Sequence, residues 1–448
     1  MTRMIYPTTN PTATEQLIIE RGEGVYVYDN HGKQYLEGMS GLWCTALGYG
    51  NEEVIEAATA QMKTLAYSHL FGGKSHPAAI ALAEKLSDMS PVKDGRVFLG
   101  NSGSDANDTQ VKLLRYYFNA IGKPGKYKII ARERGYHGVT VAAASLTGLA
   151  PNHAHFSLPF DALGVLRTGS AHFYRDGLPG ESEEEFATRR ADELEQLILA
   201  EGADTIAAFI AEPVGGAGGV IVPPNTYFEK IQAVLAKHDI LLWDDEVICG
   251  FGRTGEDFGA TTYNMRPQMA SLAKALSSAY IPLSAAIIEG DMFEAMVDQA
   301  NQVGVFGHGY TYGGHPVACA VGSKVIEIYE RDRLFEHARD VGAYMQAKIR
   351  EFADHPLVGE VRGVGMIGAV ELVANRETRQ AFADNSVGGY CQKQCEKNGL
   401  IVRAMGGNSI ALCPPLILTV EQVDEICSKL AVALEETLAW AQKSHLLA

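Results

Sequence analysis

The sequence predicts an α/β protein with a mainly parallel sheet covered by helices, plus a smaller α+β domain. From about residue 96, short apolar runs alternate with amphipathic stretches such as 225–239, and this is typical of a parallel sheet with helices on both faces. Further on, one long helical stretch (315–354) precedes two strand–turn–strand patterns and a final amphipathic helix from about Thr419. The apolar runs are RVFLG, YKIIAR, TIAAFIAEPV, ILLWDDEVI, MASLA and SAAIIEG.

The chain of 448 residues is long enough for more than one domain. An early hairpin is expected over 24–41, with Asn30–Gly32 as its turn. We predict that an N-terminal segment, 1–50, joins the small domain. The large domain then covers 51–316, and the C-terminal small domain covers 317–448.

Composition and charge limit the possible partners. The net charge of −16 argues against nucleic acid and against an anionic membrane surface. No apolar run is long enough to span a membrane, and 1–16 lacks the apolar segment of a signal peptide. The seven cysteines are scattered through the sequence, and we expect them to be reduced thiols in a cytoplasmic protein. Cys391 and Cys395 lie close in sequence, but no partners at zinc-type spacing accompany them, so no metal site is predicted.

The stretch 239–255, DILLWDDEVICGFGRTG, permits two readings. Gly250, Gly252 and Gly255 match the dinucleotide-binding pattern G-x-G-x-x-G, but the residues that follow lack the helical period needed to meet a pyrophosphate. Alternatively, the acids 244–246 at the end of the apolar run require a cation, and a protonated pyridine ring is one.

Lys274 follows the next apolar run. A lysine in apolar surroundings has a lowered pKa and forms Schiff bases. Spacing alone leaves a reactive lysine and an ordinary surface lysine equally open.

Six motifs in order resemble the class III aminotransferases, enzymes of fold type I that use pyridoxal 5′-phosphate (PLP), from about Arg21 to the final helix. Their pattern is closest to the ω-amine:pyruvate transaminases. The motifs are NSGSDAND at 101–108, YHG at 136–138, AEPVGGAGG at 211–219, DEVICGFGRTG at 245–255, Lys274, and HGYTYGGHP at 308–316.

The resemblance implies the roles of the site residues. Lys274 forms the internal aldimine and moves the proton, while Asp245 keeps the pyridine nitrogen protonated. A homodimer or a dimer of dimers is implied, since one phosphate contact comes from the neighbouring subunit. The other residues assigned to PLP are Gly103 and Ser104 at the phosphate, Tyr136 and Val247 on the two ring faces, His137 of the YHG motif, Glu212 beside Asp245, and Thr311 at the neighbour's phosphate.

Two positions suggest the substrates. Arg403 resembles the mobile arginine that binds a keto-acid carboxylate. The alternative is an exposed arginine on a hairpin, which would give the same sequence pattern. Val139 stands where relatives that use 2-oxoglutarate commonly carry an arginine, so pyruvate is the expected acceptor. Trp43 and Tyr136 would form an apolar wall for an amine or ω-amino acid donor, with Tyr6 at the entrance, although Trp43 could equally belong to the core. Use of 2-oxoglutarate and a PLP decarboxylase or aminomutase are the alternatives.

Five residues depart from the pattern of the family. Asp105 replaces a glutamate, Asp244 a small apolar residue, Ala275 a glycine, Ser284 a glycine, and Ala404 a proline. They bear on the range of substrates and leave PLP chemistry unaffected.

Overall fold

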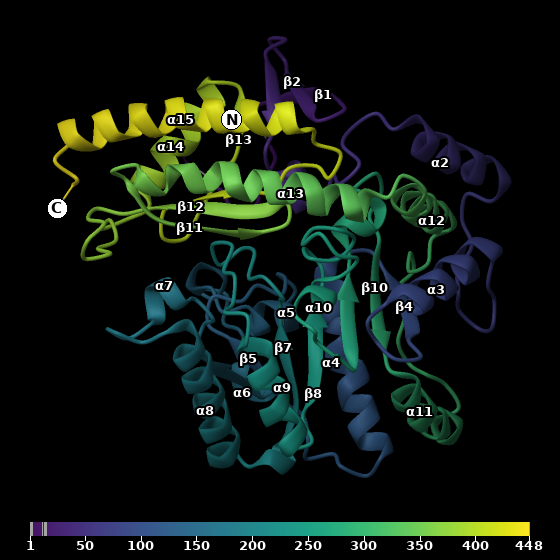
Figure 1. Ribbon diagram of the computed structural model, residues 1–448. Coiled ribbons are helices and arrows are strands. Elements are labelled where there is room, and N and C mark those ends of the chain that lie inside the picture. The colour runs from purple at the N-terminus through teal and green to yellow at the C-terminus, as the bar shows by residue number, and fades with distance from the viewer. Residues whose placement is uncertain (1–2, 11, 13–15, 448) are drawn as a thin grey trace.

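The computed structural model describes residues 3–10, 12 and 16–447. A seven-stranded sheet forms the centre of the large domain, in the order β4-β10-β9-β8-β7-β5-β6 (Figure 1). Strand β10 is antiparallel to β9 and β4, whereas β9, β8, β7, β5 and β6 pair in parallel. The strands are β4 (Arg96–Gly100), β5 (Lys128–Arg132), β6 (Val165–Thr168), β7 (Ile206–Ala211), β8 (Leu241–Asp245), β9 (Met269–Leu272) and β10 (Ser284–Ile288).

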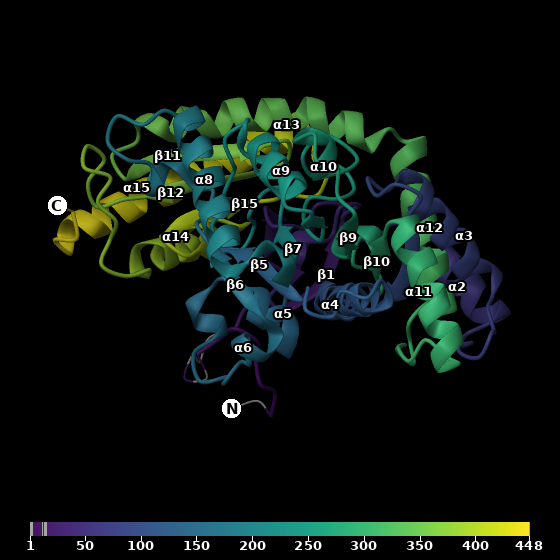
Figure 2. The same cartoon turned by 90° about the horizontal axis from the view of Figure 1, so that it is seen from below.

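Helices cover both faces of this sheet, as predicted. In Figure 2, α8 and α9 lie on one face, and α4 and α5 lie on the other. Strand β7 (IAAFIA) is accordingly apolar throughout, and every residue of it is buried. The helices of this domain are α2 (Glu52–Thr64), α3 (Pro77–Met89), α4 (Gly103–Ala120), α5 (Val141–Leu146), α6 (Phe160–Leu163), α7 (Phe173–Asp176), α8 (Glu183–Glu201), α9 (Tyr227–Lys237), α10 (Gly259–Thr262) and α11 (Gly290–Val303).

The small domain has an antiparallel sheet in the order β11-β12-β15-β14. Both predicted strand–turn–strand patterns are present in it. The final helix begins where expected, because the side chain of Thr419 accepts a hydrogen bond from the backbone of Gln422. The elements are α13 (Leu334–Arg350), β11 (Val358–Val364), β12 (Ile367–Leu372), α14 (Ser386–Lys397), β14 (Arg403–Met405), β15 (Ser409–Leu412) and α15 (Val420–Lys443).

The N-terminal strands pair with a strand from the other end of the chain. The expected hairpin is formed by β2 (Tyr26–Asp29) and β3 (Gln34–Glu37), with β1 (Ile19–Glu23) added at its edge. Strand β3 also runs parallel to β13 (Leu400–Ile401). The segment before the large domain therefore packs beside the strand that leads to Arg403.

The long helix predicted over 315–354 is two helices, α12 (Pro316–Arg331) and α13. Arg333, between them, has a φ of 53°, in the left-handed region. A right-handed helix does not continue through that conformation. The sequence prediction was wrong here because the apolar period runs on across the break.

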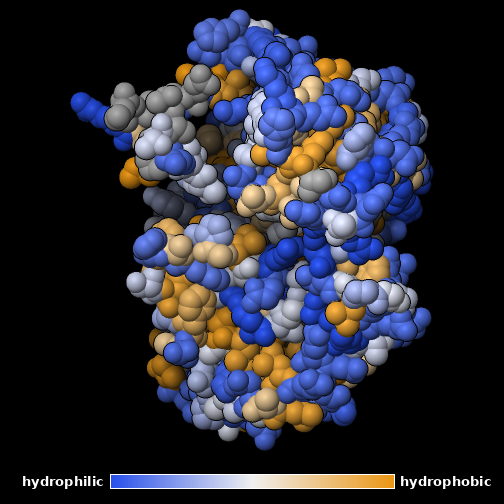
Figure 3. Space-filling model, turned by 90° about the vertical axis from the view of Figure 1, so that its left-hand side faces the viewer, coloured by the Kyte–Doolittle hydropathy of each residue, from blue (hydrophilic) through white to orange (hydrophobic). Residues whose placement is uncertain are grey.

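Buried arginines join the two domains. Arg253 Nη1 donates to the carbonyl oxygen of Met366 at 3.0 Å, and Arg362 Nε donates to the carbonyl oxygen of Val220 at 2.9 Å. On the face in Figure 3, strongly hydrophilic residues gather in the band between the upper and lower halves. The GFGRTG stretch thus contributes a contact between the domains.

Two further sequence features can be checked in the described part of the chain. None of its helices is both long and apolar enough to cross a bilayer. All seven cysteines are free thiols, and the side chains of Cys391 and Cys395 are fully buried on α14.

Candidate active site

The candidate site lies at one edge of the large sheet, where its parallel strands end. Tyr136 and His137 follow β5, Glu212 follows β7 directly, Asp245 is the last residue of β8, and Lys274 comes two residues after β9. Ligands of open α/β sheets bind at the carboxyl ends of the strands. Five predicted site residues are therefore delivered to the same edge.

The Asp245 carboxylate is held by three groups. Its Oδ2 lies 3.0 Å from Asn107 Nδ2 and 2.8 Å from His137 Nδ1, and its Oδ1 accepts the backbone N–H of Val247 at 3.2 Å. Asn107 also donates to the His137 carbonyl oxygen at 2.6 Å. An ionised carboxylate only accepts hydrogen bonds, so a carboxylate at Asp245 requires the proton of His137 on Nδ1. The three contacts hold the Asp245 side chain in a buried place.

Lys274 is positioned and tuned by its surroundings. Burial lowers the pKa of its ammonium, and the charges of Asp245 and Glu212 act in the opposite direction with smaller effect. Its φ is 50°, a strained value for a residue with a side chain. A lysine with a lowered pKa supplies the neutral amine that Schiff-base chemistry and proton transfer need.

Glu212 holds backbone in place. Its Oε1 accepts the N–H of Tyr136 at 2.9 Å, and its Oε2 accepts the N–H of Gly216 at 2.9 Å. Burial raises the pKa of this carboxyl. The glutamate thereby fixes the position of the backbone at Tyr136, in the segment that follows β5.

The turn before α4 offers free N–H groups. Among the described residues, no protein acceptor meets the N–H of Gly103 or Ser104. A Cβ on Gly103 would lie 3.0 Å from Cγ1 of Val247, so the turn and Val247 are neighbours. The Ser104 hydroxyl accepts the N–H of Val139 at 3.0 Å. A helix N-terminus with free N–H groups suits a phosphate.

Arg403 and Tyr136 lie within reach of each other's charge. Burial raises the pKa of Tyr136, and the charge of Arg403 opposes this effect. Burial lowers the pKa of Arg403, and the charge of Tyr136 opposes that effect in turn. Arg403 is half-buried on β14, and within the described residues its guanidinium has no hydrogen-bonded or ion-paired partner. A half-buried cation without a partner beside the site is suited to an anionic substrate.

Trp43 is 3% exposed and packs in a cluster with Val214, Ile248 and Met405. It ends the short turn α1 (Ser40–Trp43) with a φ of 66°. The indole therefore belongs to a buried apolar cluster that includes Met405 of β14.

Thr311 and Tyr6 lie near the surface of the subunit. Thr311 is exposed, and its carbonyl oxygen accepts a hydrogen bond from the Tyr67 hydroxyl at 2.7 Å. Tyr6 is half-buried and donates to Oε1 of Gln16 at 2.8 Å.

Of the acidic triplet, Asp245 contacts Asn107 and His137 at the site, and the other two acids are buried elsewhere. Glu246 accepts the N–H groups of Gly259 at 3.0 Å and Ala260 at 2.7 Å. Asp244 is fully buried, no donor among the described residues meets its oxygens, and its carboxyl lies against that of Glu246, with which it can share a proton. Burial and the Glu246 charge raise the pKa of Asp244 well above its usual range, and burial raises that of Glu246 to about 7. Protonation relieves the repulsion, and only Asp245 faces the site.

This pair makes stability depend on pH. Raised carboxyl pKa values mean that the folded state binds protons more tightly than the unfolded chain, whose carboxyls titrate near 4. Stability is therefore lost as pH rises from about 4 through 7. The measured quantity is the difference in unfolding free energy between Asp244→Asn and the natural chain. When the pH rises from 5 to 8, this difference is expected to change in favour of the variant by about 1 kcal/mol or more. Denaturant unfolding at both pH values measures it, and a difference that does not change with pH would contradict the raised pKa.

Two other departures have local consequences. Ala404 donates its N–H to Oε1 of Gln392 at 2.9 Å, a bond that proline cannot make, and this ties the strand of Arg403 to α14. Ala275 is buried, and its carbonyl oxygen accepts the Tyr329 hydroxyl at 2.7 Å.

The dinucleotide reading of Gly250–Gly255 is wrong. Within the described part of the chain, the only helix close behind it is α10, of four residues, and α10 uses its first N–H groups on Glu246. Residues that the sequence did not single out also reach the site. Asn107 contacts Asp245, and Cys44 lies close enough to Lys274 for each to influence the pKa of the other. Asn107 stands in the NSGSDAND motif, whereas no sequence signal marks Cys44.

The chemistry of these donors fits PLP. Its aldehyde requires an amine, its ring nitrogen requires an acid that stays ionised, and its phosphate requires N–H donors. Lys274 follows β9, Asp245 ends β8 and the turn at Gly103 follows β4, so these three groups come from strand ends of the same sheet. The fold and the site together define a PLP-dependent enzyme of fold type I.

The chain belongs to the class III aminotransferases, because the family model described as "Aminotransferase class-III" matches residues 8–434. It is 48% identical over 428 residues to gamma aminobutyrate transaminase 1, mitochondrial, of Solanum lycopersicum. The matched region covers 95% of this chain and 82% of the relative. The gamma-aminobutyrate transaminase 1 of Oryza sativa subsp. japonica is also 48% identical, with the same coverage.

Solved structures agree closely with this fold. The omega transaminase of Pseudomonas jessenii in complex with PMP has a TM-score of 0.96 and 51% identity, covering 98% of this chain and 97% of that one. A thermostable variant engineered for synthesis of enantiopure bulky amines gives the same score and identity, covering 98% of each chain. A transaminase with L-alanine has a TM-score of 0.93 and 52% identity, covering 94% of this chain and 99% of that one.

Proposed function

We propose that this aminotransferase moves an amino group from an amine or ω-amino acid to pyruvate. The observation that carries the proposal is Arg403, a half-buried guanidinium beside Tyr136 without a partner among the described residues. A guanidinium binds one carboxylate in a bidentate manner. Val139, which occupies the position of a second cation in some relatives, is 65% exposed and offers nothing to a second carboxylate.

The residues of this chain have distinct tasks in that reaction. PLP, when bound, supplies a ring that withdraws electrons from the substrate carbon. Lys274, with its lowered pKa, removes the proton from that carbon and later returns one, first as base and then as acid. Asp245, held by Asn107 and His137, keeps a proton on the ring nitrogen.

Relatives support the two classes of donor. One neighbouring structure is an omega transaminase variant engineered for synthesis of bulky amines, and the curated relatives are named for gamma-aminobutyrate, an ω-amino acid. Arg403 would bind the distant carboxylate of an ω-amino acid in one half-reaction and that of pyruvate in the other. Another neighbouring structure is a transaminase with L-alanine, the amino acid that pyruvate becomes on amino transfer.

The products identify the acceptor. The enzyme is incubated with gamma-aminobutyrate, or with 1-phenylethylamine, and either pyruvate or 2-oxoglutarate. Alanine is expected with pyruvate, and little glutamate with 2-oxoglutarate. Glutamate as the main product would replace pyruvate by 2-oxoglutarate as acceptor. Carbon dioxide release from 2-aminoisobutyrate, whose carboxylate is on the carbon that bears the amine, would favour the decarboxylase alternative.

Arg403→Gln is expected to raise the KM for pyruvate about 10- to 100-fold, the cost of losing a charge-assisted carboxylate contact. The KM for 1-phenylethylamine, which has no carboxylate, is expected to stay close to its original value. Steady-state kinetics with each substrate varied in turn measure both effects. Equal losses for both substrates would contradict a specific role in carboxylate binding.

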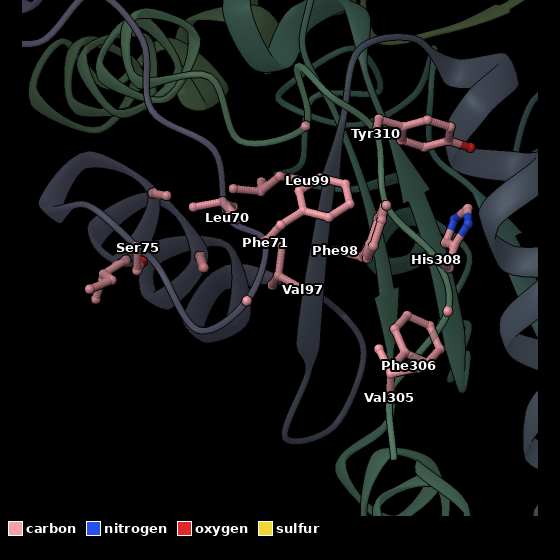
Figure 4. A pocket seen from close by; sticks show the side chains of 17 residues that line it. Leu70, Phe71, Ser75, Val97, Phe98, Leu99, Val305, Phe306, His308 and Tyr310 are labelled. Carbon is pink, nitrogen blue, oxygen red and sulfur yellow. The ribbon is translucent and has the colours of Figure 1, made fainter. Parts of the chain in front are cut away.

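We also propose that the active unit is a homodimer in which Thr311 completes the neighbouring site. A groove of about 670 Å³ beside Thr311 is lined largely by apolar side chains, which Figure 4 shows pointing into it. Several of them are strongly exposed on the single subunit, and apolar patches of this kind mark interfaces. The exposed apolar side chains in and around the groove are Phe71, Ile80, Val305 and Tyr312.

Phe71→Glu is expected to weaken the dimer at least about 100-fold, because it places a charge in an interface core. PLP affinity is expected to fall in parallel, since the neighbour's Thr311 is lost. Sedimentation velocity and a PLP titration measure the two effects. Leu199→Glu, which alters an exposed leucine on α8, is the matched control. A stable dimer in Phe71→Glu would contradict this use of the groove.

A further inference from the structure

Two of the five departures from the family pattern contact each other. The hydroxyl of Ser284 donates a hydrogen bond of 2.8 Å to Oδ1 of Asp105. Ser284 is the first residue of β10 and is fully buried, whereas Asp105 lies in the first turn of α4. The family pattern has glycine and glutamate at these positions. This chain has a shorter acid together with an added hydroxymethyl group, and the structure brings the two changes together.

Asp105 organises the turn that precedes α4. Its carboxylate accepts the backbone N–H of Asn101 at 3.0 Å and of Ser102 at 3.1 Å. The hydroxyl of Ser102 accepts the N–H of Asp105 in return, at 3.2 Å, so the turn is closed by a capping box. The free N–H groups of Gly103 and Ser104 lie inside this loop of bonds. Where they point therefore depends on where Asp105 is held.

Space around the pair is tightly filled. Gly100, at the end of β4, is paired with Ser284 across the sheet. A Cβ on Gly100 would lie 2.5 Å from Oδ1 of Asp105 and 2.6 Å from Oγ of Ser284. An extra methylene at position 105 would enter the same space. Glycine at 284 would leave room for it, but serine at 284 does not.

We propose that Ser284 and Asp105 form a matched pair that positions the turn at Gly103 and Ser104 for the PLP phosphate. Ser284 is a positioning residue that acts through Asp105 and does not touch the reacting atoms. The inference rests on the proposed placement of the phosphate at this turn, and it does not depend on which keto acid the enzyme uses. The pair sets the affinity for PLP and leaves the chemistry of bound PLP unchanged.

A double-mutant cycle tests the pairing. The dissociation constant of PLP is measured by absorbance titration of the apoenzyme for the natural chain, S284G, D105E and D105E/S284G, and the Tm of each apoenzyme is recorded. Each single change is expected to weaken PLP binding about tenfold, through loss of a hydrogen bond to an ionised carboxylate or through crowding. The double variant is expected to return to within about threefold of the natural chain.

S284A separates the hydroxyl from the space it fills, and it serves if S284G folds poorly. It is expected to weaken PLP binding like S284G, with kcat at saturating PLP unchanged. If the double variant loses PLP affinity by the product of the two single losses, the proposed pairing is overturned. A fall in Tm without any change in PLP affinity would also overturn it. If the natural chain binds PLP but reacts with 2-oxoglutarate, the proposed acceptor fails while the pair is still tested.

Discussion

Lys274→Ala is expected to lower kcat by at least about 10⁴-fold, the largest effect of any single substitution in this chain. The side chain supplies both the amine that binds the cofactor aldehyde and the base that moves the substrate proton. No other lysine follows a strand at this edge of the sheet in the described residues. Single-turnover kinetics with a saturating amine donor measure the loss.

Small amines serve as the control for this prediction. Added methylamine enters the space left by the side chain and is expected to restore part of the rate. The apoenzyme Tm shows whether the variant is folded. A kcat within about tenfold of the natural value would assign the proton transfer to another group.

Asp245→Asn is expected to lower kcat by about 10³-fold, because an amide does not hold a proton on the ring nitrogen. The substitution keeps the size of the side chain and preserves a contact with Asn107 or His137. It also removes the negative charge that opposes the effect of burial on Lys274. The pKa of Lys274 then falls further, so the acid limb of the pH–rate profile moves to lower pH.

The neighbouring residue provides a matched control. Asp244→Asn makes the same chemical change one position earlier on β8, where the side chain is fully buried and points away from the site. Its kcat is expected to remain close to that of the natural chain. Equal losses in the two variants would mean that the strand, and not the charge of Asp245, is what matters.

The sequence could predict residues that follow strands, because the carboxyl ends of parallel strands converge whatever lies between them. Asp245 and Lys274 are of this kind, whereas the roles of Tyr136 and Glu212 were implied only by the resemblance to the class III aminotransferases. Strand β6 was not predicted, since its four residues at the edge of the sheet carry little apolar signal. The break at Arg333 was missed for a related reason, because a left-handed residue leaves the apolar period intact.

Contacts between distant segments could not be predicted from one sequence. Asn107 meets Asp245 across 138 residues, and Ser284 meets Asp105 across 179. The protonation of Asp244 depends on its complete burial, which only the packed structure reveals. Each of these features comes from tertiary packing, which local sequence patterns do not encode.

We propose that Arg403, together with the uncharged Val139, selects pyruvate as acceptor. Enzyme loaded as pyridoxamine phosphate is mixed with pyruvate and, separately, with 2-oxoglutarate, and the return of the absorbance of PLP-bound enzyme is followed in a single turnover. Fast return with pyruvate and slow return with 2-oxoglutarate is the predicted result. Fast return with 2-oxoglutarate alone would contradict the claim.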